Sequence, residues 1–325
     1  MKLVIQIPCF NEAEVLPLTL SHLPREVEGF DCVEWLVVDD GSRDGTSEVA
    51  RRCGADHVVT LARNRGLARA FLAGLEAALS VGADVVVNTD ADNQYDARDL
   101  PSLVAPILAG EADLVVGARP IGQIAHFSVA KRALQKLGSA VVRLVSGTRV
   151  PDAPSGFRAM TRDAAMRLNV FGNYTYTLET LIQAGQSGMA IACVPVRVNG
   201  ETRPSRLVKS SAHYVLKSSA TILRMFVVYK PMRFFALLSA IFACPGVILG
   251  LRYLWLDAHG QGHGHVHSLI LAAMFVGVSM GLAMLGVVGD LLSVNRRLLE
   301  ETRLRLRVPS GPAAPSGRST TPTVD

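Results

Sequence analysis

The sequence predicts an α/β domain with a doubly wound, mainly parallel sheet, followed by two membrane-spanning helices. Three observations predict this fold. Short runs rich in β-branched residues alternate with helical patterns from Lys2 to about Val198, and this alternation is typical of parallel sheets. The runs are almost wholly apolar, as expected of strands that are covered on both faces. Two much longer apolar segments follow in the last third of the chain, and each is long enough to cross a membrane.

The expected strands and helices alternate in chain order. Strands are expected at residues 3–7, 34–39, 57–61, 84–89, 113–117 and 191–198, and helices at residues 12–23, 46–52, 66–81, 99–108 and 129–145. The first helix follows Asn11, which we interpret as its N-cap, with Glu14 three residues later completing a capping box. In such sheets ligands bind at the carboxyl ends of the strands, and functional residues are expected there.

The chain changes character after Val198. Residues 213–230 have the pattern of an amphipathic helix with basic residues, which could lie on an anionic membrane surface or, alternatively, pack on the domain. Segments 234–256 and 269–292 each carry one charge, Arg252 or Asp290, near their ends. A helix of about 23 residues spans roughly 30 Å. A buried pair of core helices is the alternative, but core helices of this length are seldom apolar on all sides.

The distribution of basic residues predicts the orientation of the two spans. Lysine and arginine flank both spans on their outer ends and are absent from the loop between them. The positive-inside rule then places the N-terminal domain and the C-terminal tail in the cytoplasm, with the chain in the cell membrane. The expected organisation is a ligand-binding domain (1–208), a juxtamembrane helix (209–233), spans at 234–256 and 269–293, an extracytoplasmic loop (257–268) and a basic, disordered tail (294–325).

The amino-acid composition and net charge limit the classes of ligand that the protein is expected to bind. Hydrophobic residues make up 49% of the chain and charged residues 19%, which is apolar for a soluble protein. The net charge of +5 suits anionic ligands such as phosphorylated compounds or lipids. Basic and aromatic residues are not interleaved, so no nucleic-acid partner is expected. The five cysteines lie far apart without a CxxC pair, which indicates reduced thiols and argues against a zinc site.

Acidic residues follow three of the expected strands. The first strand leads into PCFNE with Glu12, the second ends at Asp39 and Asp40, and the fourth leads to Asp90 and Asp92. Turns favour Asp and Asn, so one such cluster would carry little weight. Parallel strands, however, bring all three clusters to one edge of the sheet. The Asp90-x-Asp92 pair offers oxygen ligands to Mg²⁺ or Mn²⁺, and such a metal would bind a diphosphate and neutralise its charge.

The segments PCFNE, VVDDGSRDGT, DADNQY and SGFRAM, in this order, resemble the motifs of family 2 glycosyltransferases. More narrowly, they resemble the subgroup that makes polyprenyl-phosphate sugars, such as dolichol-phosphate mannose synthase and its membrane-anchored bacterial relatives. The resemblance covers roughly residues 2–210. It implies a GT-A-like fold, a UDP- or GDP-linked sugar donor, Mg²⁺ or Mn²⁺, and a polyprenyl phosphate acceptor at the membrane, and it is compatible with a homo-oligomer.

The resemblance also implies roles for individual residues. The expected catalytic residues are Asp40, Asp90, Asp92 and Arg119, and the expected metal ligands are Asp90, Asp92 and Gln94. The residues expected to contact the nucleotide-sugar are Pro8, Glu12, Asp39, Asp90, Gln94 and Arg203. Those expected to contact the acceptor phosphate are Arg119, Lys131, Arg132 and Arg206. Residues 155–158 match the SGFR turn of the family, but Leu67 and Ala68 depart from its N-x-G-x-G segment after Asn64 and Gly66.

The expected acceptor determines whether a base is needed. An ionised lipid phosphate could attack the anomeric carbon in one in-line displacement, with inversion, and no proton would have to leave the nucleophile. Catalysis would then rest on positioning and on electrostatic stabilisation of the leaving diphosphate. A sugar hydroxyl acceptor would require a base, for which Asp40 or an acidic residue further along the chain is a candidate.

Other functions are weighed against this one. A transferase that elongates polysaccharides would carry a QxxRW motif, and neither Trp35 nor Trp255 follows an arginine. A non-catalytic membrane scaffold with the same fold is expected to lose the acidic residues that this chain keeps. A dinucleotide-binding oxidoreductase would carry GxGxxG after the first strand, where this chain has PCFNEAE.

Overall fold

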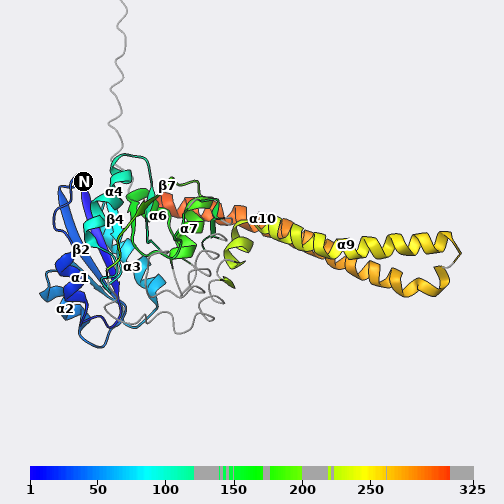
Figure 1. Cartoon of the computed structure of the whole chain (residues 1–325), viewed down its shortest axis with the longest axis horizontal. Helices are drawn as coiled ribbons and strands as arrows, with labels where there is room; N and C mark the ends of the chain where they lie inside the picture. The colour runs from blue at the N-terminus through cyan, green and yellow to red at the C-terminus, as the bar shows by residue number, and fades with distance from the viewer. Residues whose placement is uncertain are drawn as a thin grey trace, which may run out of the picture.

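The computed structural model describes residues 1–120, 139, 142–143, 146–148, 150–170, 176–199, 219–220, 223–260 and 262–307. These residues form an α/β domain and a long helical hairpin that projects from it (Figure 1). Most of the helix expected over 129–145, and part of that expected over 213–230, lie outside the described residues.

A seven-stranded sheet forms the centre of the domain. Its strands are β1 (Lys2–Cys9), β2 (Cys32–Asp39), β3 (His57–Thr60), β4 (Val85–Asn88), β5 (Leu114–Ala118), β6 (Arg158–Thr161) and β7 (Ile191–Pro195). They are arranged in the order β3-β2-β1-β4-β6-β5-β7. All are parallel except β6, which is antiparallel to β4 and β5. The six predicted strands are confirmed. β6 was not predicted, because its four residues are too few to show a period and follow a turn-like SGF segment.

Helices cover both faces of the sheet, as the doubly wound prediction requires. They are α1 (Leu16–His22), α2 (Thr46–Arg52), α3 (Leu67–Ser80), α4 (Leu100–Leu108) after the short helix η1 (Ala97–Asp99), α6 (Arg162–Arg167) and α7 (Thr177–Gln186). One core joins the sheet to α3, α6 and α7, through residues such as Phe71, Ala164 and Leu181. The other joins it to α1, α2 and α4, through residues such as Leu16, Ala50 and Leu103. Burial on both faces explains why the strands are apolar almost without interruption.

The start of α1 differs from the prediction. The helix begins at Leu16 rather than near Glu12, and no side chain caps it. Asn11 adopts a left-handed conformation with φ of 54°, and its Oδ1 accepts a hydrogen bond from the N–H of Arg43. The predicted capping box is therefore wrong, because Asn11 instead ties the end of β1 to the loop after β2. Pro17 in the first turn suits a helix that starts at this point.

Two long helices form the hairpin. They are α9 (Pro231–Ala258) and α10 (Val266–Arg307), joined through η2 (Gly262–His265). Residues 231–258 and 266–296 are long and apolar enough to span a membrane, and only 6% and 17% of their most apolar windows are buried. Core helices of a soluble protein would be mostly covered, so this exposure favours a lipid environment. Within the hairpin the Ser239 hydroxyl lies 2.9 Å from that of Ser279.

The hairpin is seated in the core of the domain by the segment that precedes α9. Met225 and Tyr229 belong to the same core as α3, α6 and α7. Nη2 of Arg224 donates to the buried carboxylate of Glu179 in α7 at 2.6 Å. From the other side, the Ser293 hydroxyl of α10 donates to the carbonyl of Val228 at 2.8 Å. The first span and the second are thus both attached to the α/β domain.

We expect Arg224→Ala to destabilise the domain. The substitution removes the guanidinium from the buried Glu179 carboxylate, which should lower the free energy of unfolding by about 1–3 kcal/mol. Thermal unfolding of the full-length protein in detergent measures the effect. The control is Arg51→Ala, which removes only an exposed pair with Glu48 at 4.0 Å and should stay within about 0.5 kcal/mol of wild type. Equal melting temperatures for both variants would contradict the attachment.

Candidate active site

The carboxyl ends of β1, β2 and β4 lie side by side at one edge of the sheet. Cys9 at the end of β1 is in register with Asp39 at the end of β2. On the other side of β1, Gln6 is in register with Asn88 at the end of β4. The three acidic clusters that the sequence places after separate strands therefore leave neighbouring strands at the same edge.

Asp39 holds the loop that follows β2. Its carboxylate accepts hydrogen bonds from the N–H of Ser42, at 2.9 Å, and from the hydroxyl of Ser47 in α2. The side chain is buried, as is Pro8 in the neighbouring strand, whose register partner is Val38. These residues form a packed wall at the position where the resemblance places the nucleotide. Their contact with a nucleotide remains a prediction.

Asp40 holds the turn that precedes α3. Its Oδ1 accepts from the N–H of Arg65 at 2.7 Å, and its Oδ2 accepts from the N–H of Gly66 at 2.8 Å. Burial raises the pKa of Asp40, while these two donors act in the opposite direction. The turn lies so close that a Cβ on Gly41 would approach the backbone of Arg63 to 2.5 Å. The geometry makes Asp40 the anchor of this turn, and its expected catalytic role remains a prediction.

Glu12 lies where the chain passes from β1 towards α1. Its N–H donates to the Thr46 hydroxyl at 3.0 Å, and its carbonyl accepts from the N–H groups of Val15 and Leu16. Asp44 strengthens this junction by accepting from the N–H and hydroxyl of Thr46. Burial alone would raise the pKa of Asp44, but the hydrogen bonds prevail and lower it. The backbone at Glu12 is therefore fixed against the start of α2.

Asp90 follows β4 and is electrostatically coupled to Asp92. Burial, reinforced by the negative charge of Asp92, raises the pKa of Asp90 to about 7, while the positive charges of Arg119 and Arg158 act in the opposite direction. Two carboxylates that share a site repel each other, and a cation between them relieves the repulsion. This pair is the strongest electrostatic indication of a divalent cation in the described structure.

Gly156 lies against the carboxylate of Asp90. A Cβ at this position would come within 2.8 Å of both Asp90 oxygens and 3.0 Å of the Tyr176 hydroxyl. The N–H of Gly156 donates to the Tyr95 hydroxyl at 2.9 Å, and its carbonyl accepts from Nδ2 of Asn88 at 2.8 Å. The SGFR segment thus contributes Gly156 to the site, because a residue with a side chain would collide with Asp90 at this position.

A buried polar network lies next to Asp90 and was not identified from the sequence. Nε2 of Gln6 donates to Oδ1 of Asn88 at 2.9 Å, and Nδ2 of Asn88 donates to the Tyr176 hydroxyl at 2.7 Å. Tyr176 stacks on Phe71 with ring centroids 3.9 Å apart. The sequence could have indicated this network, because Gln6 and Asn88 are polar residues within otherwise apolar strands.

Arg119 follows β5 and is held by a buried carboxylate. Its Nε and Nη2 donate to the two oxygens of Asp152 at 2.7 and 3.1 Å, and the side chains are 10% and 0% exposed. Its Nη1 reaches Oε1 of Gln94 at 3.4 Å. The structure therefore brings Arg119 to the acidic segment after β4, and its expected contact with phosphate or sugar remains a prediction. The role of Asp152 was not predicted from the sequence, because this residue lies in no recognisable motif.

Arg158 is not available to a ligand. It is 1% exposed and donates to the carbonyl groups of Ser155 and Ala153 and to the Thr180 hydroxyl, at 2.8–2.9 Å. Burial lowers the pKa of Arg158. Its hydrogen bonds hold the chain on both sides of Gly156 in place, so this arginine of the SGFR segment acts as a structural residue.

The segment that carries Asp92 and Gln94 is held by two other parts of the chain and by one internal hydrogen bond. The Thr19 hydroxyl of α1 donates to the carbonyl of Ala91 at 2.7 Å. The N–H of Gln94 donates to Oδ1 of Asp92 at 3.1 Å. Nδ2 of Asn199 donates to the carbonyl of Asn93 at 2.9 Å. The backbone of the Asp90-x-Asp92 motif is therefore rigidly placed before any ligand arrives.

The donor set fits a hard divalent cation. Asp90 and Asp92 offer carboxylate oxygens, and Gln94 offers an amide oxygen. Within the described ranges, no cluster of three or more Asp, Glu, His or Cys side chains is placed to hold a metal. A metal held here would thus have few protein ligands. Mg²⁺ and Mn²⁺ accept such sites because they keep several waters and take substrate phosphates as ligands.

Four predicted basic residues fall outside the described residues. They are Lys131, Arg132, Arg203 and Arg206. Their roles towards the acceptor phosphate and the donor remain predictions.

Comparison with known sequences identifies a family and several named relatives. The model of the family "Glycosyl transferase family 2" matches residues 4–168. An undecaprenyl-phosphate mannosyltransferase of Micrococcus luteus is 32% identical over 63% of this chain and 88% of the relative. A polyprenol monophosphomannose synthase of Mycolicibacterium smegmatis is 30% identical over 59% of this chain and 76% of the relative.

Comparison with solved structures shows the fold. Glucosyl-3-phosphoglycerate synthase of Mycobacterium tuberculosis, in complex with Mn²⁺, uridine diphosphate and glucosyl-3-phosphoglycerate, superposes with a TM-score of 0.53. The match has 24% sequence identity and covers 70% of this chain and 78% of that structure. The GT-A-like fold implied by the motifs is thereby confirmed.

We expect Gly156→Ala to weaken binding at the site without unfolding the domain. The added Cβ would displace the Asp90 carboxylate, whose oxygens lie 2.8 Å from its position, so the affinity for Mg²⁺ or Mn²⁺ should fall by about tenfold or more. Calorimetric titration of the metal in the presence of nucleoside diphosphate measures this. Gly277→Ala is the control, because nothing lies within 4 Å of its added Cβ. An unchanged affinity in Gly156→Ala would contradict the role of this glycine.

We also expect a pH-dependent stability that originates in Asp90. Folding raises its pKa from 3.8 to about 7. The protonated form is therefore favoured in the folded state, and this contribution is lost as pH rises through about 7. The loss begins above pH 3.8 and is complete above about pH 7, so in metal-free protein Asp90→Asn should raise the melting temperature clearly more at about pH 8 than at about pH 5. Asp163→Asn, at an exposed site of α6, is the control, and an equal Asp90→Asn effect at both pH values would refute the shift.

Proposed function

Since the chain belongs to glycosyl transferase family 2 and is a glycosyltransferase, we propose that it transfers a hexosyl group, with inversion, from a UDP- or GDP-linked sugar to a polyprenyl phosphate. One observation carries the proposal: a rigid Asp90-x-Asp92 site and an apolar two-helix hairpin belong to one continuous fold. A soluble donor and a lipid-borne acceptor could therefore meet on this domain. Two relatives named for mannosyl transfer to polyprenyl phosphates support the choice of acceptor.

The donor would bind at the edge formed by β1, β2 and β4. We infer that Pro8, Glu12 and Asp39 line the nucleoside pocket. Asp90 and Asp92, with Gln94, would hold Mg²⁺ or Mn²⁺ against the diphosphate. The metal would supply charge neutralisation for the departing nucleoside diphosphate. The fold neighbour from M. tuberculosis, which was solved with Mn²⁺ and uridine diphosphate, is in keeping with this arrangement.

The acceptor would need no general base. A phosphate monoester is ionised at neutral pH, so its oxygen could attack the anomeric carbon directly. Arg119 is suited to face the phosphates because Asp152 fixes its guanidinium in one orientation and Gln94 links it to the acidic segment. A guanidinium oriented in advance loses little freedom on binding a phosphate. Lys131, Arg132 and Arg206 are proposed to share the acceptor phosphate, and Arg203 the donor diphosphate.

The membrane hairpin would bring the site to its lipid. Lysine and arginine flank both helices on the domain side, and the connecting loop contains none. We therefore propose that the α/β domain and the C-terminal tail are cytoplasmic. The attachment through Arg224 and Ser293 would hold the domain close to the bilayer, where a polyprenyl phosphate presents its head group.

The test is a donor screen with the full-length protein in detergent. GDP-mannose, UDP-glucose and UDP-N-acetylglucosamine are supplied in turn with undecaprenyl phosphate and Mg²⁺ or Mn²⁺, and both nucleoside diphosphate and glycolipid are measured. GDP-mannose is the first choice because both named relatives transfer mannose. One donor should give glycolipid only when metal and lipid are present. Asp92→Asn should lower the rate by about 100-fold or more, whereas Asp163→Asn should leave it unchanged.

The products separate this function from its rivals. Nucleoside diphosphate released without glycolipid would point to a saccharide hydroxyl acceptor or to hydrolysis. Glycolipid formed at an undiminished rate by Asp92→Asn would contradict the assigned metal site. Absence of turnover with every donor, together with metal-dependent nucleotide binding, would favour a non-catalytic scaffold.

A further inference from the structure

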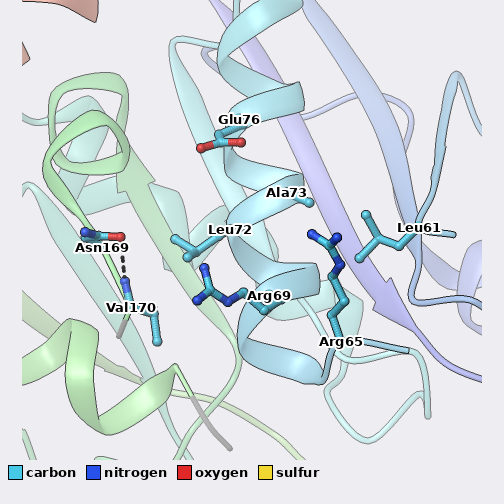
Figure 2. Close-up of a pocket in the computed structure, with 8 residues that line it drawn as sticks. All are labelled: Leu61, Arg65, Arg69, Leu72, Ala73, Glu76, Asn169 and Val170. Atoms are coloured by element: carbon cyan, nitrogen blue, oxygen red, sulfur yellow. Dashed lines mark hydrogen bonds between the residues drawn. The ribbon is translucent and has the colours of Figure 1, made fainter. Parts of the chain in front are cut away.

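A cavity opens beside α3. It has a volume of about 430 Å³ and lies between α3 and the chain that follows α6 (Figure 2). The residues that line it are Leu61, Arg65, Arg69, Leu72, Ala73, Glu76, Asn169 and Val170. None of them belongs to the predicted donor or metal site. We refer to this cavity as the α3 pocket.

Two arginines of the α3 pocket are free to bind an anion. Arg65 and Arg69 are both exposed, and in the part of the chain that the structure describes neither guanidinium has a carboxylate partner. Arg224, by contrast, is paired with the buried carboxylate of Glu179. Guanidinium groups bind phosphate through charge-assisted hydrogen bonds. Among the residues that the structure describes, the positive charge at this position therefore has no ion-pair partner, and it is available to a ligand.

The rest of the pocket restricts the size and shape of that ligand. Leu72, Ala73 and Val170 supply an apolar wall, and Figure 2 shows Arg69 directed from α3 towards the side on which Val170 lies. Glu76 lines the pocket seven residues after Arg69, about 10 Å further along the helix axis. A long polyanion would meet this carboxylate. A single phosphate group with an apolar portion attached would avoid it.

The position of the pocket favours a ligand from the membrane. Val170, Met225 and Tyr229 belong to one buried core, and Leu72 packs against that core. The α3 pocket therefore lies on the face of the sheet on which the base of the membrane hairpin is seated. The N–H of Arg65 also donates to Asp40 at 2.7 Å, so the pocket and the edge of the sheet share one turn.

We propose that the α3 pocket is a second ligand site, which binds a phosphate ester with its phosphate on Arg65 and Arg69 and its apolar part against Leu72 and Val170. The head group of an anionic lipid and free phosphate share this chemistry. The site needs neither the metal nor the nucleotide-sugar, so it stands whether or not the proposed transfer reaction is correct.

The experiment is a calorimetric titration of the full-length protein in neutral detergent, with a chelator present and no nucleotide. The probes are dihexanoyl phosphatidic acid and inorganic phosphate. Arg65→Gln/Arg69→Gln should weaken binding by about tenfold or more, equivalent to about 1.4 kcal/mol. Arg52→Gln, an exposed arginine of α2 against the other face of the sheet, should bind like wild type. Both arginines of the pocket are exposed, so the double variant is expected to melt like wild type.

Two further variants identify the source of the phosphate and separate the two sites. If the lipid binds more tightly than inorganic phosphate, and Leu72→Asn weakens only the lipid, the ligand is a lipid head group. If both probes bind equally and both depend on the two arginines, the site binds free phosphate, and the proposed contact of an apolar part with Leu72 and Val170 is refuted. Asp92→Asn should bind both probes like wild type, which separates this site from the metal site. Failure of both probes to bind, or unchanged binding in the double arginine variant, would overturn the proposal.

Discussion

The packing of carboxylates at one edge of a parallel sheet is the constraint on which the rest of the structure depends. In-register pairing of β1 with β2 and β4 places acidic residues next to one another, and each must be compensated. Asp39 and Asp40 are compensated by the loops that follow, through Ser42, Arg65 and Gly66. Asp90 instead has a pKa of about 7, raised first by burial and then by the negative charge of Asp92. The loops thus satisfy the acids that shape the edge, whereas Asp90 and Asp92 are the carboxylates at which we propose a divalent cation.

Beside this edge, polar contacts lead from the site to the hairpin. Gln6 and Asn88 connect the sheet to Tyr176, which immediately precedes α7. α7 carries Glu179, which is held by Arg224, and the chain after Arg224 is in turn contacted by Ser293 of α10. Each contact is short and most are buried, so the orientation of the hairpin and that of the Asp90 surroundings are set by one connected framework. In the proposed reaction, which joins a soluble donor to a lipid, such a framework would hold the site at a fixed distance from the membrane.

The arginine side chains of this domain lie in three different environments. Arg158 is buried and satisfied by neutral oxygens, which makes it a structural residue. Arg119 is paired in a fork with Asp152 yet stays at the acidic edge, which orients it before a phosphate arrives. Arg65 and Arg69 are exposed in a partly apolar pocket. Net charge alone suggested phosphorylated ligands, but only these separate environments indicate which arginines can bind them.

The sequence by itself determined the six parallel strands, the doubly wound order and the two apolar helices, because period, length and apolarity are local properties. It also placed Asp39, Asp90 and Arg119 at strand ends. β6 and two contacts became visible only in the folded structure. Gly156 lies against Asp90, 66 positions away, and Arg119 pairs with Asp152, 33 positions away. The folded structure also replaced the predicted capping role of Asn11 with a bond to Arg43. Contacts between distant segments leave no periodic trace in a single chain, so only the folded arrangement could reveal them.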